Sequence, residues 1–177
     1  LLLEKILYSK KPYLTVRLPG MILAKKSYGE LIFERIKNVP ENNWVLSLKE
    51  GTNYIPWLGI KIEVKRYERS PHFNPKTNNL MVAYLDGEKA TDLKVRTFRN
   101  GDRFFPLGLE RPVKLKDFFI KNKVPRDKRR NIPVVVSNEN IVWVTGLRID
   151  ERYKVRDDTK VIVSLEASHQ DNKNRHF

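Results

Sequence analysis

The sequence predicts an α+β fold that is mostly β, with one or two short helices. Its apolar residues fall mainly in short runs that end at Pro-, Gly- or Asn-containing turns, as strands do. Only two segments carry apolar residues at helical spacing. The 177 residues, 40% of them hydrophobic, are enough to bury a core as one domain or two small ones.

The first helical segment is residues 1–8, where Leu3, Ile6 and Leu7 share one face before Lys11-Pro12 ends the pattern. We interpret it as the end of a preceding helical region. Because the chain also lacks an initiator Met, we expect it to be part of a longer protein.

Strands follow along most of the remaining chain. A turn is expected after the first of them at Pro19-Gly20, and further turns at Asp86-Gly87 and Asn100-Gly101, the last being a strong tight-turn signal. Residues 68–79 form a polar loop that contains two prolines. The expected strands are residues 13–18, 30–36, 44–48, 60–64, 80–85, 95–99, 134–136, 141–144 and 161–165.

The second helical segment is residues 113–123, where Leu115, Phe118 and Phe119 lie at positions i, i+3 and i+4. Pro112 suits the start of this helix, and Pro125 ends it. One more helical turn is expected within residues 126–131.

Positive charge is concentrated in one part of the chain. The formal net charge is +14, and residues 91–133 alone hold thirteen Lys and Arg against five Asp and Glu. Such a patch on a folded unit is typical of a nucleic-acid-binding protein. An anionic membrane surface and an acidic protein are the other candidate partners of a basic chain, and no membrane partner is expected. The basic residues fall among turns and strands, whereas a membrane-surface helix needs a large apolar face.

The sequence shows no catalytic or metal-binding motif. With no cysteine, disulfides, thiolate zinc sites and cysteine nucleophiles are excluded, which fits a cytoplasmic protein. No Gly-rich phosphate loop is present, and His72, His169 and His176 lack metal-ligand spacing. Asp150-Glu151 and Asp157-Asp158 are interpreted as solvated turn residues rather than catalytic pairs. We therefore expect no catalytic residue and no metal site.

Three ordered segments resemble the C-terminal domain of the tRNA(Ile)-lysidine synthetase family. They are RTFRNGDRFFPLG at 96–108, KLKDFFIKNKVPRDKRRNIP at 114–133 and IVWVTGLRIDERYKV at 141–155, which together cover roughly 70 of the 177 residues. Residues 17–90 resemble the preceding part of the family more weakly. Many members carry a Gly-rich stretch and two lysines before LKDFF; this chain has residues 109–113 and only Lys114 there, with Arg111 as a partial replacement.

The resemblance implies a parent enzyme that attaches lysine to the wobble cytidine of tRNA(Ile) with a CAU anticodon. It uses ATP with Mg, and its chemistry belongs to an N-terminal ATP-pyrophosphatase domain whose SGGxDS loop is absent from this sequence. The C-terminal region would contact the tRNA body and acceptor stem and help to distinguish tRNA(Ile) from tRNA(Met). The implied fold is a β-sandwich-like domain also found in the phenylalanyl-tRNA synthetase β chain.

The same comparison suggests a domain division. Residues 1–16 would end a helical linker region, 17–90 would form a β-rich C-terminal subdomain, 91–168 the basic, tRNA-facing C-terminal domain, and 169–177 a frayed tail. The expected partners are the tRNA and the enzyme's own N-terminal domain.

Arginines and lysines held on rigid elements are suited to bind A-form RNA, because its phosphates and its wide minor groove are accessible to them. Arg103 has an alternative role, pairing with a carboxylate inside the domain, and a solvated basic face is the alternative for the helix and loop residues. Arg148 and Arg152 are expected to pair with Asp150 and Glu151. The predicted tRNA-binding residues are Arg96, Arg99, Arg103, Lys114, Lys116, Arg126, Arg129 and Arg130.

A second set of motif residues is expected to be structural. Gly101, and with it Gly108 and Gly146, would supply turns with positive φ. Core packing is favoured over base stacking for Phe104, Phe118, Phe119 and Trp143. The structural set is Gly101, Asp102, Phe118, Phe119, Pro125, Trp143 and Gly146.

Two other functions remain open. The chain could be a docking domain that stabilises the parent enzyme or a homodimer, or a β-sandwich module of a tRNA synthetase.

Overall fold

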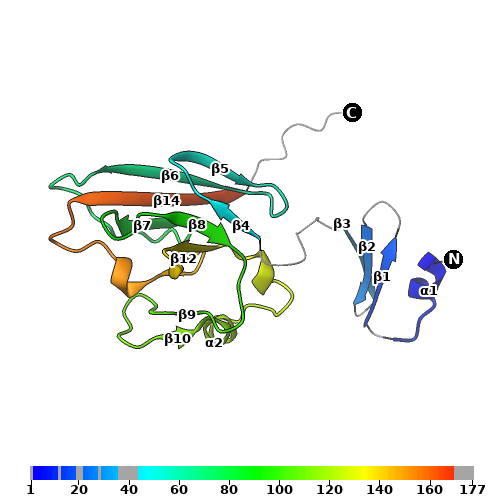
Figure 1. Cartoon of the computed structure of the whole chain (residues 1–177). Coiled ribbons are helices and arrows are strands. Elements are labelled where there is room, and N and C mark those ends of the chain that lie inside the picture. Colours follow the sequence, from blue (N-terminus) through cyan, green and yellow to red (C-terminus); the bar gives the residue numbers. More distant parts are fainter. Residues whose placement is uncertain (1, 12, 19–21, 28, 36–43, 170–177) are drawn as a thin grey trace. The chain divides into compact units, whose positions relative to one another are not determined.

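The structure is a computed structural model that describes residues 2–11, 13–18, 22–27, 29–35 and 44–169 (Figure 1). The chain divides into two compact units, Leu1–Val39 and Pro40–Phe177. Each unit is described separately below. The predicted Pro19-Gly20 turn and most of the predicted tail, from residue 170, lie outside the described residues.

The first unit is a short helix and a three-stranded antiparallel sheet. Helix α1 (Leu2–Leu7) precedes strands β1 (Tyr13–Leu18), β2 (Ile22–Ser27) and β3 (Glu30–Arg35), which pair in that order. Ile6 of α1 and Ala24 of β2 are fully buried, so the helix packs on one face of the sheet. The predicted helix in 1–8 and strand at 13–18 are confirmed, and so is the strand at 30–36 up to Arg35, since residue 36 lies outside the described residues. Residues 13–16, assigned to the helical linker region, are part of β1.

The second unit contains two antiparallel sheets (Figure 1). The outer sheet has the order β5 (Gly51–Ile55), β6 (Ile60–Glu68), β14 (Val161–His169) and β7 (Val82–Asp86). The other sheet has the order β13 (Arg148–Ile149), β12 (Asn140–Val144), β11 (Val134–Ser137), β8 (Leu93–Arg96) and β4 (Val45–Ser47). The two sheets are stacked, as the resemblance to a sandwich implied.

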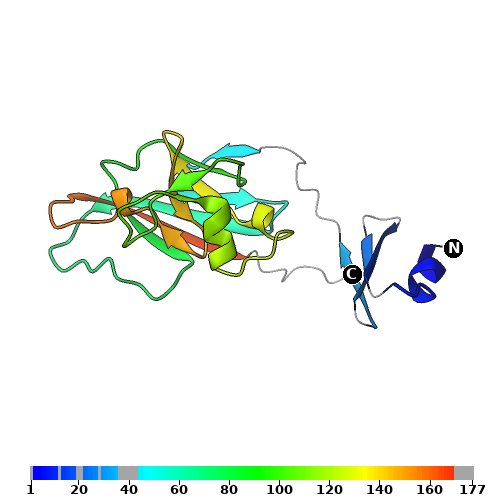
Figure 2. The same ribbon diagram turned by 90° about the horizontal axis from the view of Figure 1, so that it is seen from below.

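A third layer covers the free face of the five-stranded sheet (Figures 1 and 2). It consists of the two-stranded ribbon of β9 (Arg103–Phe104) and β10 (Val113–Lys114), helix α2 (Leu115–Lys121) and the 3₁₀ turn Arg129–Asn131. A second 3₁₀ turn, Glu151–Tyr153, follows β13. We call the ribbon, α2 and the loop through residue 131 the basic layer, since they hold most of the 91–133 charge.

The position of the five-stranded sheet between two layers explains its composition. All four residues of β11, and all but the first of β12, are buried, because both faces of these strands are covered. Strand β6 begins with buried residues alternating with less buried ones and then becomes exposed, as expected for an outer strand with one covered face. A mostly-β fold with two short helices is therefore confirmed.

Aromatic side chains fill the core between the five-stranded sheet and the basic layer. Phe104 and Phe119 are fully buried among Leu115, Val134 and Val136. The Phe104 and Phe118 rings meet edge to face at 4.9 Å, and Phe98 and Phe119 do so at 5.5 Å. Trp143 on β12 is not part of this cluster; it is 1% exposed and lies with Ala83 and Tyr84 of β7. The predicted core role of Phe104, Phe118, Phe119 and Trp143 is confirmed.

The expected domain boundary near residue 90 does not coincide with a division of the structure. Strand β14 pairs with β6 and β7, and β8 pairs with β4, so strands from both sides of residue 90 share each sheet. The structure divides near residue 40 instead. The physical reason is that the outer sheet would lose β14, the strand between β6 and β7, if residues 17–90 folded alone.

The predicted helix at 113–123 is too long by two residues at each end. Val113 and Lys114 are strand residues paired with Phe104 and Arg103, so Pro112 precedes a strand and does not start the helix. The helix ends at Lys121, and Lys123 adopts a positive φ of 55° before Pro125. The additional turn expected within 126–131 is present as Arg129–Asn131.

Candidate nucleic-acid interface

Helix α2 presents a charged face to solvent because its apolar face is anchored in the core. Leu115 and Phe119 are buried, whereas Lys116 and Lys121 are exposed. Ile120, between them, is 54% exposed, which makes it an apolar residue within a basic surface. The helical period therefore sends the lysines outward from a rigid support.

Two cations lie directly opposite each other on the β9–β10 ribbon. Arg103 pairs in register with Lys114, and both side chains are exposed. Their neighbours Phe104 and Val113 point the other way and pack in the core, so Arg103 and Lys114 share the outer face. Like charges at such cross-strand positions repel each other. In the described part of the chain, neither forms an ion pair, so an anion bound between them would relieve this repulsion.

Further predicted residues lie on the loop that follows α2. Arg126 and Arg130 are exposed and pair with no carboxylate among the residues described. Arg129 is half-buried, and its Nε donates a hydrogen bond of 3.1 Å to the Val124 carbonyl. That bond fixes the guanidinium near the end of α2 and leaves its other nitrogens available.

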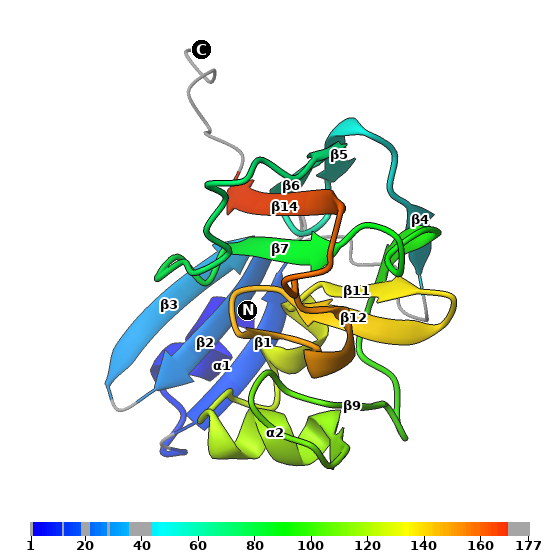
Figure 3. The same cartoon turned by 90° about the vertical axis from the view of Figure 1, so that its left-hand side faces the viewer.

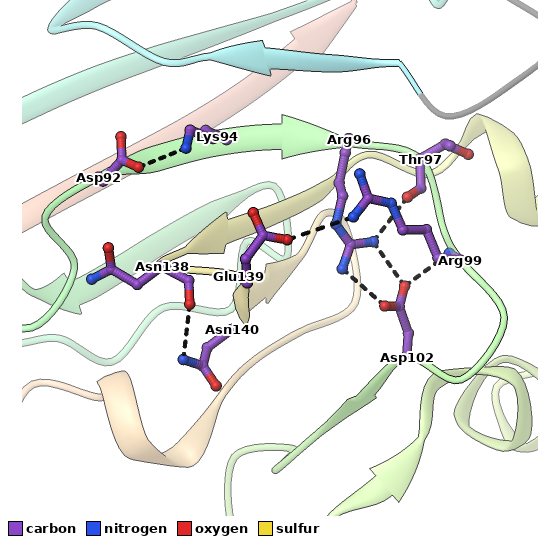
Figure 4. Close-up of polar contacts among 9 residues, drawn as sticks. All are labelled: Asp92, Lys94, Arg96, Thr97, Arg99, Asp102, Asn138, Glu139 and Asn140. Carbon is purple, nitrogen blue, oxygen red and sulfur yellow. Dashed lines mark hydrogen bonds and ion pairs between the residues drawn. The ribbon is translucent and has the colours of Figure 1, made fainter.

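Arg99 is partly committed to the protein. Its Nη1 lies 3.5 Å from the Glu139 carboxylate in the turn between β11 and β12, and its side chain is 35% exposed (Figure 4). Because Glu139 itself is largely exposed, this pair is weak and can be exchanged for another anion.

Arg96 does not reach the surface, which corrects its prediction as a tRNA-binding residue. The residue is 3% exposed, and its guanidinium donates two hydrogen bonds of 2.8 Å to the Asp102 carboxylate (Figure 4). A third bond of 3.0 Å runs from Arg96 Nη1 to the Thr97 carbonyl. Asp102 therefore pairs with Arg96 at the end of β8, and not with the neighbouring Arg103, which is exposed.

Asp102 ties the basic layer to the five-stranded sheet. Its Oδ2 also accepts a hydrogen bond of 2.8 Å from the Arg99 amide, and its carbonyl accepts one of 2.8 Å from the amide of Leu115 at the start of α2. Gly101 supplies the turn with a φ of +89°, as predicted. Asp102 thus joins β8 and the turn through its carboxylate, and the first residue of α2 through its backbone carbonyl.

A second carboxylate anchor is Asp150, which was predicted to be a solvated turn residue and is instead 0% exposed. It accepts hydrogen bonds from the Phe105 amide at 2.9 Å and from the Arg152 amide and guanidinium at 2.9–3.0 Å. The predicted pairing of Arg152 is confirmed, and its guanidinium also lies 4.5 Å above the Phe105 ring. The hydrogen bond to Asp150 raises the Arg152 pKa, because it favours the charged guanidinium.

The neighbouring Glu151 holds the loop that follows β9. Its Oε2 accepts a hydrogen bond of 2.9 Å from the Gly108 amide, and its other oxygen pairs with Lys154. These two interactions, the amide first, lower the pKa of the Glu151 carboxyl below its ordinary value. Gly108 and Gly146 have φ values of +89° and +72°, as predicted. Arg148 is exposed and forms no ion pair with a described residue, unlike its prediction.

The interface is thus a set of exposed cations held on a frame of two Arg–Asp pairs. The Arg96–Asp102 pair is buried, whereas in the Arg152–Asp150 pair only the carboxylate is buried. Sequence reasoning missed the role of Asp150, although its place between Arg148 and Arg152 was a usable signal. In the described ranges, no three or more His, Asp or Glu side chains gather to hold a metal ion. None of the helices described there is long and apolar enough to cross a membrane.

Comparison with known proteins gives the same family in three ways. The sequence model of the family described as "TilS substrate C-terminal domain" matches residues 93–165. A tRNA(Ile)-lysidine synthase from Dehalococcoides mccartyi is 47% identical over 49% of this chain and 18% of its own length. One from Caldanaerobacter subterraneus subsp. tengcongensis is 33% identical over 85% of this chain and 32% of its own length. The chain therefore spans about a third or less of these relatives.

The fold comparison agrees with the sequence comparison. A crystal structure of a TilS C-terminal domain superposes with a TM-score of 0.63 and 25% identity, covering 74% of this chain and 100% of that one. A fragment of the phenylalanyl-tRNA synthetase β-subunit from Pyrococcus horikoshii matches over 51% of the chain with a TM-score of 0.44 and 18% identity.

Proposed function

The chain contains the C-terminal domain of the tRNA(Ile)-lysidine synthase family, and we propose that this domain binds the body and acceptor stem of tRNA(Ile) with a CAU anticodon. The observation that carries the proposal is the cross-strand pair Arg103 and Lys114, two exposed cations on one face of the β9–β10 ribbon. A phosphate between them turns a repulsive pair into a favourable one.

The remaining cations extend this contact along a duplex. Lys116 is exposed on α2, and Arg126 and Arg130 are exposed on the loop after it. Backbone phosphates on successive nucleotides offer a row of anions to such a surface, and A-form RNA leaves these phosphates accessible. Ile120 is exposed among the lysines, where it can lie against the sugars of a shallow minor groove.

The catalytic chemistry is assigned to another part of the parent enzyme. There, ATP with Mg activates the wobble cytidine and lysine is attached to it, in the cytoplasm. The C-terminal domain would carry no catalytic residue and would hold the tRNA so that its anticodon reaches the catalytic domain.

The test is the double variant Arg103→Ala with Lys114→Ala. Both side chains are exposed, and Lys114 makes no side-chain cap bond to α2, so the fold should persist. Fluorescence anisotropy with labelled tRNA should show weakened binding and a slope of log K against log salt shallower by about 2, one unit for each lost phosphate contact. The matched control is Lys61→Ala with Lys65→Ala on β6, two exposed cations of the outer sheet. If the Arg103/Lys114 double variant bound tRNA with the same affinity and the same salt slope as the Lys61/Lys65 control, the proposal would be rejected.

Protein docking is a second candidate function, favoured by the apolar surface of the first unit. Phe33 and Ile32 on the edge strand β3 are 53% and 40% exposed. Consecutive strand residues point to opposite faces, so both faces of this edge are apolar. A dimer that forms without RNA and persists in high salt, measured by sedimentation, would support docking through this unit. A monomer at all salt concentrations would exclude the homodimer.

A further inference from the structure

A groove of about 620 Å³ opens beside β7, the strand labelled in Figure 3 next to β14. The loop before β7 forms one wall with Leu80 and Asn78, and the segment around β13 forms the other with Leu147 and Arg148. Leu107, from the loop after β9, completes the lining. The proposed function does not use this groove.

The groove is basic and contains no carboxylate. Its charged lining residues are Lys76, Arg148 and Lys154, with no Asp or Glu among the lining side chains. Lys154 pairs with Glu151, but Lys76 and Arg148 are exposed and form no ion pair within the part of the chain that the structure describes. Two other clefts of the same unit contain carboxylates beside their Lys or Arg residues. Charge complementarity therefore selects an anionic occupant for this groove.

The uncharged lining suits the flat face and polar edge of a nucleobase. Leu80 and Leu107 are 56% and 37% exposed, so each offers an apolar surface that the fold itself does not cover. Asn78 is exposed, and its side-chain amide bonds to no described residue, so its donors and acceptor are available to a base edge. Apolar contact with the face of a base and hydrogen bonds to its edge are how proteins recognise unpaired nucleotides.

An extended peptide fits less well. It would pair with the free edge of β7, but Leu85 on that edge is already bridged to Lys154. Only Val82 to Tyr84 remain, which is too short a stretch for an added strand of ordinary length.

We infer that the groove binds an unpaired nucleotide of the RNA whose duplex lies on the basic layer, an inference that rests on the proposed function. The two sites are close along the chain, since Leu107 follows Arg103 by four residues and can be at most about 14 Å from it. Arg148 and Lys76 would hold the phosphates on either side of the base. The groove would thereby recognise the junction between a duplex and a single strand.

The test compares a short blunt RNA duplex with the same duplex carrying a single-stranded extension at its 3′ or 5′ end. We expect one extension to strengthen binding to the 177-residue chain by roughly fivefold or more, the usual size of one base contact. Lys76→Ala with Arg148→Ala, and separately Leu80→Ala, should remove this gain and leave blunt-duplex affinity unchanged. Lys61→Ala with Lys65→Ala should keep the gain. All these side chains are exposed, so folding is not at stake.

The outcomes separate this inference from the proposed function. If the chain binds the blunt duplex but neither extension adds affinity, or the groove variants keep the gain, the groove assignment is overturned while the basic layer stands. If an extended peptide shifts the backbone NMR signals of residues 82–84 and the RNA extension does not, the groove belongs to a protein partner and the inference is wrong. If the blunt duplex itself fails to bind, the proposed function fails first.

Discussion

Arg96 and Asp102 are joined by two hydrogen bonds of 2.8 Å in a site where both side chains are at most 10% exposed. The pair lies between the end of β8 and the turn that leads into the basic layer (Figure 4). Arg96 is the one arginine classed as buried among the residues that the structure describes, and Asp102 neutralises its charge next to the apolar core. The exposed arginines and lysines are left for a partner.

Replacing Asp102 with Asn should therefore destabilise the second unit strongly. The change leaves the Arg96 cation buried without its counter-ion, which costs about 3–5 kcal/mol when one partner of a buried pair is removed. Urea unfolding would measure the loss. Asp92→Asn is the matched control, since Asp92 pairs with Lys94 at the surface and its loss should cost under about 1 kcal/mol. Similar unfolding free energies for the two variants would contradict the anchoring role.

Asp150→Ala should be about as damaging as the loss of Asp102. The fully buried Asp150 carboxylate accepts hydrogen bonds from the Phe105 amide and from Arg152. Its removal leaves the Phe105 amide without an acceptor and Arg152 without its ion-pair partner. We expect a loss of roughly 3 kcal/mol or more in unfolding free energy. Asp158→Ala, in an exposed turn, should change stability by about 0.5 kcal/mol or less. A mild effect at Asp150 would show that the loop after β9 is held by other contacts.

Glu151 should make the free energy of unfolding fall as the pH is lowered into the acid range. Its folded pKa lies below the ordinary value of 4.5, because the Gly108 amide and Lys154 favour the ionised form. The stabilisation is complete above the unfolded pKa and disappears as the pH falls through the lower folded pKa. Urea midpoints of wild type and Glu151→Gln should therefore differ by a constant amount at neutral pH and converge below about pH 4.5. A difference that grows in acid would contradict this sign.

Lys116→Ala with Arg126→Ala should weaken tRNA binding without loss of stability. Both side chains are exposed and contact no described carboxylate, and each is expected to meet one phosphate. The salt slope should become shallower by about 2. If the tRNA affinity and the melting temperature of this variant are both unchanged, Lys116 and Arg126 belong to a solvated basic face that does not bind RNA.

Long apolar patterns made most of the second unit predictable. Val134 to Val136 and the run around Trp143 could only be buried strands, and Phe119 follows the apolar face of α2. Strand β2 was missed because Lys25 and Lys26 break its apolar run, and β5 because Gly51 and Asn53 are typical of turns.

Short elements and ion pairs depend on tertiary contacts and were harder to predict. Val113 carries an apolar side chain that fits a helix start, but pairing with Phe104 places it in a strand. Arg96 follows Val95 on a strand covered on both faces, so its inward direction depends on Asp102, six residues away. Local sequence does not reveal that the carboxylate is buried beside it.

The most direct test of the central claim is binding of this chain to tRNA(Ile) with a CAU anticodon and to tRNA(Met) across a salt series. The basic layer predicts that log K falls linearly with log salt for both, with the tighter binding to tRNA(Ile) persisting as salt rises. An affinity for tRNA(Ile) that does not change with salt, or that equals the affinity for tRNA(Met) at every salt concentration, would contradict it.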